Sequence, residues 1–255
     1  MGIDPDTTED TVLGGRLTLR QPRRGHRVGH DAILLAAATA ARAGEQAADL
    51  GAGVGGAGLA LAARVPGLAV ALIEIDASLA ALAEENARRN KMAERVRAFA
   101  CDVEDRAALA AFGLGPASLD RVLMNPPFND EHRTNVSPDP RRRLAHAAAP
   151  GLLERWIATA EWLLKPQGTL TLIWRADALT DVLAALKVAF GGIGVLPVFP
   201  RPSEPAIRVL VRGVKAGKGA LRDYPGLVLN DLKHRPTPAA EAILRGGETL
   251  AMAKE

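Results

Sequence analysis

Short apolar runs alternate with segments of helical periodicity along most of this chain, beginning after Gly44. The apolar runs predict seven strands, at residues 47–50, 68–75, 96–101, 119–124, 169–174, 194–199 and 207–212. The periodic segments predict one helix that leaves a glycine turn and ends near residue 65, and others at 78–90, 106–112, 152–164 and 177–190. Strands that alternate with helices pair in parallel through right-handed crossovers. The pattern therefore predicts an α/β fold with a doubly wound, mostly parallel, seven-stranded sheet.

The N-terminal part departs from this alternation. Residues 1–12 are polar without an apolar period, so we expect them to be frayed. Residues 13–21 alternate weakly and predict a short hairpin. Asp31 precedes the apolar run 32–38 and is expected to cap a helix there.

The C-terminal part predicts one irregularity in the sheet. Too few residues separate the last two strands for a crossover helix, so we expect the seventh strand to be antiparallel. A further strand at 227–229 and a helix at 238–244 are predicted beyond it. We divide the chain into a basic arm with its helix, residues 1–43, and one main domain, residues 44–255.

The composition is that of an ordinary globular chain of 255 residues, with 48% hydrophobic and 24% charged residues. No apolar run reaches the roughly 18 residues that span a bilayer. The polar N-terminus does not resemble a secretory signal, so a cytoplasmic protein is expected. Cys101 is the only cysteine and the five histidines lack metal-ligand spacing, which argues against a metal site. The net charge of +3 permits a nucleic-acid partner without requiring one.

A glycine-rich turn follows the first predicted strand, with the sequence Asp49-Leu50-Gly51-Ala52-Gly53-Val54-Gly55-Gly56. Because glycine has no Cβ atom, the backbone turns tightly and a ligand lies close against it at the carboxyl edge of the sheet. The glycine spacing alone also fits a nicotinamide or flavin site. Asp49 is placed to orient the loop or to meet an ammonium group.

Acidic residues end the next two strands. Glu74 is placed to accept both hydroxyls of a ribose that lacks a 2′-phosphate, and Asp102 to accept a hydrogen bond from an adenine amino group. The alternative is a purely structural role, in which Asp76 or Asp102 caps the helix that follows it. Together with the glycine turn, these positions favour an adenosine-containing cofactor.

The tetrapeptide Asn125-Pro126-Pro127-Phe128 follows the fourth predicted strand. Its two prolines remove two backbone donors and hold the chain extended, which keeps carbonyl groups in place. The Asn125 side-chain oxygen and the Pro126 carbonyl are suited to accept the two N–H groups of an exocyclic nitrogen, while Phe128 offers a face for stacking a base. The alternative is that this tetrapeptide simply ends the strand and that Phe128 belongs to the hydrophobic core.

These features resemble the class I S-adenosylmethionine-dependent methyltransferases, which have a Rossmann-like fold. The glycine turn after an acidic residue, and the acidic residues after the next two strands, match the pattern of that family. The resemblance implies the cofactor S-adenosyl-L-methionine and a cofactor site made of residues from five segments. They are Asp31, Asp49, Gly51, Ala52, Gly53, Glu74, Ile75, Asp102, Val103 and Asn125.

The segment from Gln21 to Ala36 resembles the N-terminal signature of the tRNA (adenine-N6)-methyltransferase family that acts on valine tRNA. In that family a glutamine, a glycine and a basic or aromatic stretch precede an Asp-x-x-Leu-Leu-Ala helix. The resemblance covers nearly the whole chain and implies methylation of an adenine in a tRNA. Phe128 departs from it, because many members have Tyr there and Phe also occurs in ribosomal RNA guanine-N2 methyltransferases.

Exposed arginines are the candidates for an RNA contact, since phosphate binding needs a basic surface near the site. Those candidates are Arg23, Arg24, Arg27, Arg141, Arg142 and Arg143, with a solvated surface run as the alternative. Three other functions stay open: an RNA guanine-N2 methyltransferase, a protein glutamine-N5 methyltransferase, and a nucleotide-binding module without catalysis.

Overall fold

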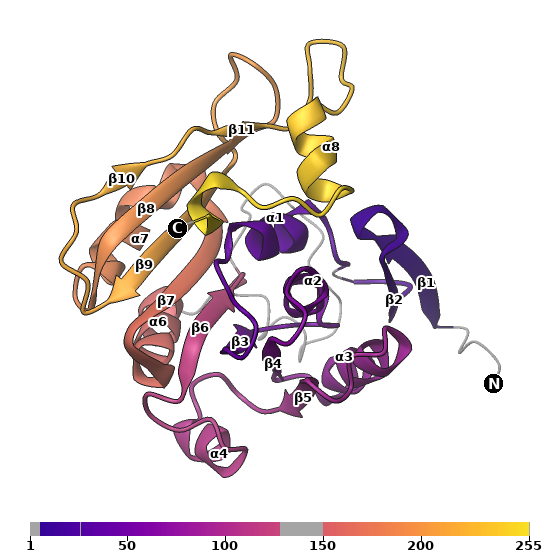
Figure 1. Cartoon of the computed structure of the whole chain (residues 1–255), viewed down its shortest axis with the longest axis vertical. Coiled ribbons are helices and arrows are strands. Elements are labelled where there is room, and N and C mark those ends of the chain that lie inside the picture. Colours follow the sequence, from indigo (N-terminus) through magenta and orange to yellow (C-terminus); the bar gives the residue numbers. More distant parts are fainter. Residues whose placement is uncertain (1–5, 26, 128–149, 255) are drawn as a thin grey trace.

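A nine-stranded sheet forms the centre of the computed structural model, which describes residues 6–25, 27–127 and 150–254. The strand order is β10-β8-β9-β7-β6-β3-β4-β5, and β11 pairs with β8 (Figure 1). The strands are β3 Gln46–Leu50, β4 Ala69–Glu74, β5 Val96–Ala100, β6 Leu119–Met124, β7 Leu164–Arg175, β8 Phe190–Phe199, β9 Arg208–Lys215, β10 Arg222–Asp223 and β11 Leu227–Val228. All seven predicted strands are present, and the mostly parallel, doubly wound sheet is confirmed.

The strand β9 is antiparallel to both of its neighbours, β7 and β8, as the short connection predicts. Several strands have other bounds than expected, above all β7 and β8, which both begin earlier than predicted. β7 begins at Leu164 and not at the predicted residue 169, because residues 165–168 form a bulge within the strand, where Gln167 has a φ of 66°. β10 was not predicted, since a strand of two residues has no pattern.

Helices cover both faces of the sheet. They are α1 His30–Ala38, α2 Gly56–Arg64, α3 Ala77–Arg89, α4 Arg106–Ala111, α6 Leu152–Leu163, α7 Leu179–Leu186 and α8 Pro238–Leu244, with short 3₁₀ turns η1 Leu13–Gly15, η2 Ala176–Ala178 and η3 Ala251–Ala253. Successive strand residues face opposite sides, so Leu72 lies in the core under α1, α2 and α3, and Ile73 in the core under α4, α6 and α7. In the part of the chain described here, no helix is long and apolar enough to cross a membrane.

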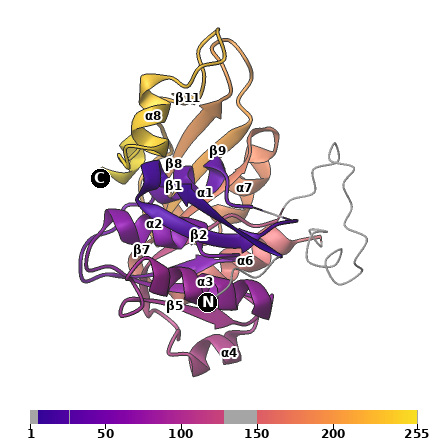
Figure 2. The same ribbon diagram turned by 90° about the vertical axis from the view of Figure 1, so that its right-hand side faces the viewer.

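The N-terminal residues form a hairpin that packs on α3, with strands β1 Thr7–Val12 and β2 Leu17–Pro22 (Figure 2). The expectation that residues up to 12 are frayed is therefore wrong from Thr7 onward, and the hairpin is longer than predicted. Polar β1 is held by its pairing with β2 and by an ion pair of 2.6 Å between Glu9 and Arg89. A strand held by such contacts has no apolar alternation to reveal it.

Helix α1 begins one residue before Asp31, and its N-cap is Gly29. The predicted capping role of Asp31 is wrong. Its side chain lies in the first turn of α1 and accepts a hydrogen bond of 2.9 Å from Nε of Arg208 on β9. The predicted C-terminal strand and helix are confirmed as β11 and α8.

Candidate functional site

The carboxyl ends of β3, β4, β5 and β6 meet along one edge of the sheet. The register pairs Leu50 with Ile73 and with Met124, and Glu74 with Ala100. Since adjacent strands lie about 4.8 Å apart, the segments after these four strands border one continuous edge. The glycine turn, Glu74, Asp102 and Asn125 therefore come together there.

The glycine turn needs glycine at position 51 for two reasons. Gly51 has a φ of 71°, which L side chains rarely adopt, and a Cβ atom there would lie 2.6 Å from the ring of Trp156. Trp156 belongs to α6 and is 8% exposed, so the ring supports the turn from below. Gly53 has a φ of 56°, and its Cβ position is open, with no described heavy atom within 4 Å. The turn is thus packed on one side and open on the other.

Asp49 lies beneath this turn and joins it to α2. Its side chain is 2% exposed, and its Oδ2 accepts a hydrogen bond of 2.8 Å from the backbone N–H of Gly58. A Cβ atom on Gly58 would lie 2.3 Å from the Leu72 side chain, so only glycine allows this approach. Burial raises the pKa of Asp49 to about 7 against the lowering effect of the Gly58 bond, and the charge of Glu74 adds to the rise. Asp49 therefore connects the end of β3 to the first turn of α2, and its two predicted roles stay predictions.

Glu74 connects the ends of β3 and β4. Its Oε2 accepts a hydrogen bond of 2.8 Å from the Gly53 N–H, and its Oε1 accepts one of 2.9 Å from the Asp76 N–H. The next residue, Ile75, is 60% exposed although it is apolar. The exposed apolar side chain of Ile75 thus follows the buried carboxylate of Glu74 at the carboxyl edge of the sheet.

Asp102 lies after β5, and the structure answers whether it caps a helix. Its Oδ1 accepts a hydrogen bond of 2.9 Å from the Glu104 N–H, whereas Asp105 caps α4. Asp76 does cap α3, through the N–H groups of Ser78 and Leu79. The capping alternative is therefore correct for Asp76 and wrong for Asp102, whose neighbour Val103 is buried.

Asn125 directly follows β6. Its Oδ1 is buried, and it has no hydrogen-bond partner among the described residues. Pro126 is buried, Pro127 is half-buried, and neither has an N–H group to offer. Phe128 lies outside the described residues. The structure therefore places a buried acceptor, unpaired as far as residues 6–25, 27–127 and 150–254 show, next to the glycine turn.

Sequence reasoning missed the first turn of α6. Nε of Arg155 donates a hydrogen bond of 2.7 Å to Glu104, the residue whose N–H binds Asp102. The next residue, Trp156, contacts Gly51. The helical periodicity of this segment predicted a helix but not its neighbours, because the partners lie about 50 and 100 residues away along the chain.

The arginine candidates differ in their surroundings. Arg27 pairs with Asp10 and donates a hydrogen bond of 2.9 Å to Thr8, so its guanidinium is engaged within the N-terminal part. Arg23 and Arg24 are exposed. The cluster Arg141, Arg142 and Arg143 lies outside the described residues. Asp31 lies at the same edge of the sheet, beyond the end of β7. Across the described ranges, no group of three His, Cys, Asp or Glu side chains is arranged to hold a metal ion.

A doubly wound sheet with a glycine turn and two acidic strand ends at its carboxyl edge defines the Rossmann-like class, whose members bind ligands at this edge. The family model described as Methyltransferase small domain matches residues 26–197, which is more than half of the chain. This chain belongs to that family.

Curated relatives share a single description. A tRNA1(Val) (adenine(37)-N6)-methyltransferase of Porphyromonas gingivalis W83 is 35% identical over 164 residues, which are 61% of each chain. The protein of the same name from another strain of that species is 34% identical over 66% of each chain, and that from Dyadobacter fermentans is 27% identical over 79% of this chain and 80% of the relative. The chain thus spans less than two thirds of the length of the two Porphyromonas relatives.

Solved structures share the fold. A protein of Agrobacterium tumefaciens described as a predicted O-methyltransferase has a TM-score of 0.71 and 31% identity, covering 86% of this chain and 97% of that chain. A SAM-dependent O-methyltransferase of Thermotoga maritima has a TM-score of 0.54 and 18% identity, covering 77% of this chain and 69% of that chain. The second likeness supports the fold alone.

Proposed function

We propose that this chain transfers a methyl group from S-adenosyl-L-methionine to an exocyclic nitrogen, and that the acceptor is N6 of an adenine in a tRNA. The observation that best supports a nitrogen acceptor is the buried Oδ1 of Asn125, which has no partner among the described residues. A buried acceptor that lacks a donor costs about 1–3 kcal/mol. An N–H group of the substrate removes this cost when it donates to Asn125, so the site is suited to a donor that arrives with the substrate.

The edge of the sheet fits the proposed cofactor. A carboxylate has about four lone-pair sites, and the two backbone bonds to Glu74 leave it able to accept ribose hydroxyls. Exposed Ile75 provides an apolar surface for the adenine, and Asp102 an acceptor for its amino group. Gly53 leaves the backbone open to close approach. When bound, the cofactor supplies an electrophilic methyl group on a sulfonium.

The Asn125-Pro126 segment orients the acceptor nitrogen. Its two N–H groups donate to the Asn125 Oδ1 and to the Pro126 carbonyl, which directs the lone pair toward the methyl group. The lone pair becomes less delocalised as the nitrogen turns pyramidal, and positive charge develops next to two fixed oxygens. The proton can leave after transfer, so no strong base is required, and the proposal involves no metal ion.

The tRNA substrate rests on the relatives, all described as acting on tRNA1(Val), and on exposed Arg23 and Arg24. A tRNA-modifying enzyme is expected in the cytoplasm. The Agrobacterium neighbour's description suggests a hydroxyl acceptor instead. A hydroxyl has one hydrogen to donate, whereas an amino group has two and matches two acceptors. Guanine N2 and a glutamine amide share this match and remain the alternatives.

A labelling experiment decides between these acceptors. The protein is incubated with methyl-labelled S-adenosylmethionine and bulk RNA from a strain that lacks it, and the RNA is digested to nucleosides. We expect label in N6-methyladenosine, and far slower labelling with Asn125→Ala. Label in N2-methylguanosine would select the guanine alternative, and label only in protein the glutamine alternative. Label in a ribose or another hydroxyl would refute the nitrogen acceptor.

A further inference from the structure

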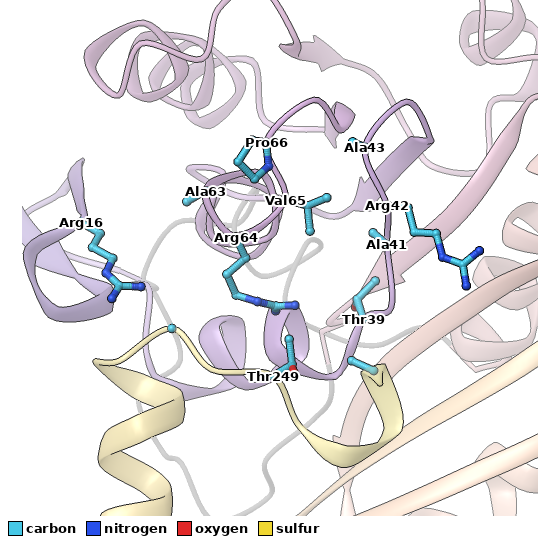
Figure 3. A pocket seen from close by; sticks show the side chains of 12 residues that line it. Arg16, Thr39, Ala41, Arg42, Ala43, Ala63, Arg64, Val65, Pro66 and Thr249 are labelled. Atoms are coloured by element: carbon cyan, nitrogen blue, oxygen red, sulfur yellow. The ribbon is translucent and has the colours of Figure 1, made fainter. Parts of the chain in front are cut away.

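A cavity of about 640 Å³ lies at the opposite edge of the sheet, before β3 and β4 begin. Four segments far apart in the sequence line it: the end of η1, the link from α1 to β3, the end of α2, and the tail after α8 (Figure 3). The volume lies within the range of small-molecule sites, about 300–1,000 Å³. No residue of the proposed methyl-transfer site lines it.

The charged residues that line this cavity are all arginines: Arg16, Arg42 and Arg64. In the described part of the chain none of them forms an ion pair within 4.0 Å. Figure 3 shows Arg64 and Thr249 at the centre, Arg16 on one side and Arg42 directed outward on the other. The cavity is therefore cationic, and no acidic side chain is among the described residues that line it.

Arg64 is the inner member of this set. Its Nε is buried and has no hydrogen-bond partner among the described residues, whereas one of its terminal nitrogens donates to the Ala36 carbonyl. Burial lowers its pKa to about 10. Other donors satisfy the neighbouring carbonyls at the end of α1. The Thr39 hydroxyl donates to the Leu35 carbonyl at 2.8 Å, and the Leu250 N–H donates to the Ala37 carbonyl at 2.9 Å. The side chain of Arg64 thus lines the cavity as a half-buried cation, and its buried Nε has no partner among the described residues.

The rest of the wall is apolar and small, and includes Ala41, Ala63, Val65 and Pro66. We propose that the cavity binds a nucleoside monophosphate group, with the phosphate on Arg64 and Thr249, Arg16 closing from the rim, and the nucleoside against the apolar wall. Arginine suits this role because its planar fork donates two parallel hydrogen bonds to a phosphate. The group belongs either to a free nucleotide or to the 5′ end of an RNA.

Calorimetric titration with uridine 5′-monophosphate in a chloride buffer tests the site, with uridine and inorganic phosphate as the two partial ligands. We expect the monophosphate to bind at least about tenfold more tightly than phosphate, which corresponds to about 1.4 kcal/mol, and uridine not to bind. Arg64→Met should abolish binding, Arg16→Ala should weaken it about tenfold, and Arg88→Met, on the exposed face of α3, should change nothing.

The proposal is overturned if the wild-type protein does not bind the monophosphate, if Arg64→Met still binds it, or if Arg16→Ala binds it as tightly as the wild-type protein. Arg16 is exposed, so its variant tests the site even if loss of Arg64 destabilises α1. A 5′-phosphorylated oligoribonucleotide that binds more tightly than the mononucleotide, with the same dependence on Arg64, identifies RNA as the source. Equal or weaker binding identifies the free nucleotide. No methyl donor is present, so these results do not depend on the proposed methyl transfer.

Discussion

Asn125 has an unpaired buried oxygen at the end of β6, beside a glycine turn that is open on one side. At the level of a single residue, an unsatisfied buried polar group indicates which kind of ligand group a site is suited to bind. The sequence made Asn125 a site candidate, because its neighbours Pro126 and Pro127 lack N–H groups, and its role in the site stays a prediction. That its oxygen has no partner among the described residues depended on the folded environment.

We predict that Asn125→Ala lowers the rate of methyl transfer by about 10²–10³, the usual effect of removing one preorganised polar contact from a reacting centre. The affinity for S-adenosylmethionine should change little, because Glu74 and Asp102 hold the other end of the cofactor. Single-turnover kinetics and calorimetry separate the two quantities. If cofactor binding falls as steeply as the rate, the proposed contact with the acceptor nitrogen is wrong.

Asp49 allows a prediction about pH. Burial raises its pKa from 3.8 to about 7, so the carboxylate is disfavoured in the folded state. The contribution of Asp49 to the free energy of unfolding is greatest below pH 3.8, declines as the pH rises toward 7, and is constant above 7. Asp49→Asn keeps an oxygen for the Gly58 N–H and has no charge. Its advantage in unfolding free energy should therefore grow between pH 4 and 7 and reach roughly 2–4 kcal/mol at pH 8.

Denaturant unfolding at several pH values measures this advantage. Asp181→Asn, on the exposed face of α7, is the matched control and should show no such growth. A stability difference that is the same at pH 4 and pH 8 would contradict the buried carboxylate. The same variant tests the second predicted role of Asp49, because loss of the charge should weaken cofactor binding if the carboxylate meets an ammonium group.

At the scale of elements, the turn between β3 and α2 depends on two glycines for different reasons. Gly51 combines a φ of 71° with a Cβ position 2.6 Å from Trp156, whereas Gly53 combines a φ of 56° with open space. Sequence spacing treats the two alike. Only the packing of α6 beneath the turn distinguishes them.

We predict that Gly51→Ala destabilises the protein by about 2–5 kcal/mol, from backbone strain and overpacking together. Gly53→Ala should cost only about 1–2 kcal/mol of strain but should reduce cofactor affinity, because its Cβ atom points into open space. Unfolding and binding measurements on both variants make the comparison. Adding Trp156→Leu should restore part of the stability lost in Gly51→Ala, and an absence of any restoration would refute the contact.

Elements were predictable where their own periodicity decided them, as for β3, β4 and β6. The ends of the elements were less predictable from the sequence. Asp31 had the sequence context of a capping residue, but its carboxylate accepts a hydrogen bond from Arg208, which lies 177 positions away in the sequence. β1 was missed because cross-strand pairing and ion pairs hold it, and neither leaves an apolar pattern.

At the scale of the whole molecule, Asn86 links three parts of the fold. Its side chain is fully buried, exchanges hydrogen bonds of 2.7 and 3.0 Å with the backbone of Arg20 in the hairpin, and donates one of 3.0 Å to the Val54 carbonyl in the glycine turn. Asn90, one turn later, bonds to Thr18 in the hairpin but not to the glycine turn. The proposed division of the chain at residue 43 stays a prediction.

We predict that Asn86→Ala lowers both the unfolding free energy, by about 2–4 kcal/mol for several buried groups left unpaired, and the affinity for the cofactor. Asn90→Ala should lower stability alone, since it loosens the hairpin without touching the turn. Thermal unfolding and cofactor titration of the two variants test the link. Equal cofactor affinity in both variants would show that the hairpin and the turn are independent.

The sequence by itself determined the class of fold, the positions of its principal strands along the chain, and the residues at their carboxyl ends. It did so because buried strands and amphipathic helices have local periods, and because parallel strands bring their carboxyl ends to one edge. The tertiary structure decided which of those residues are bonded, buried or open. The support of Gly51 by Trp156, the link from Asn86 to Val54, and the arginine cavity at the opposite edge all join distant segments, and contacts of that kind have no period along the chain.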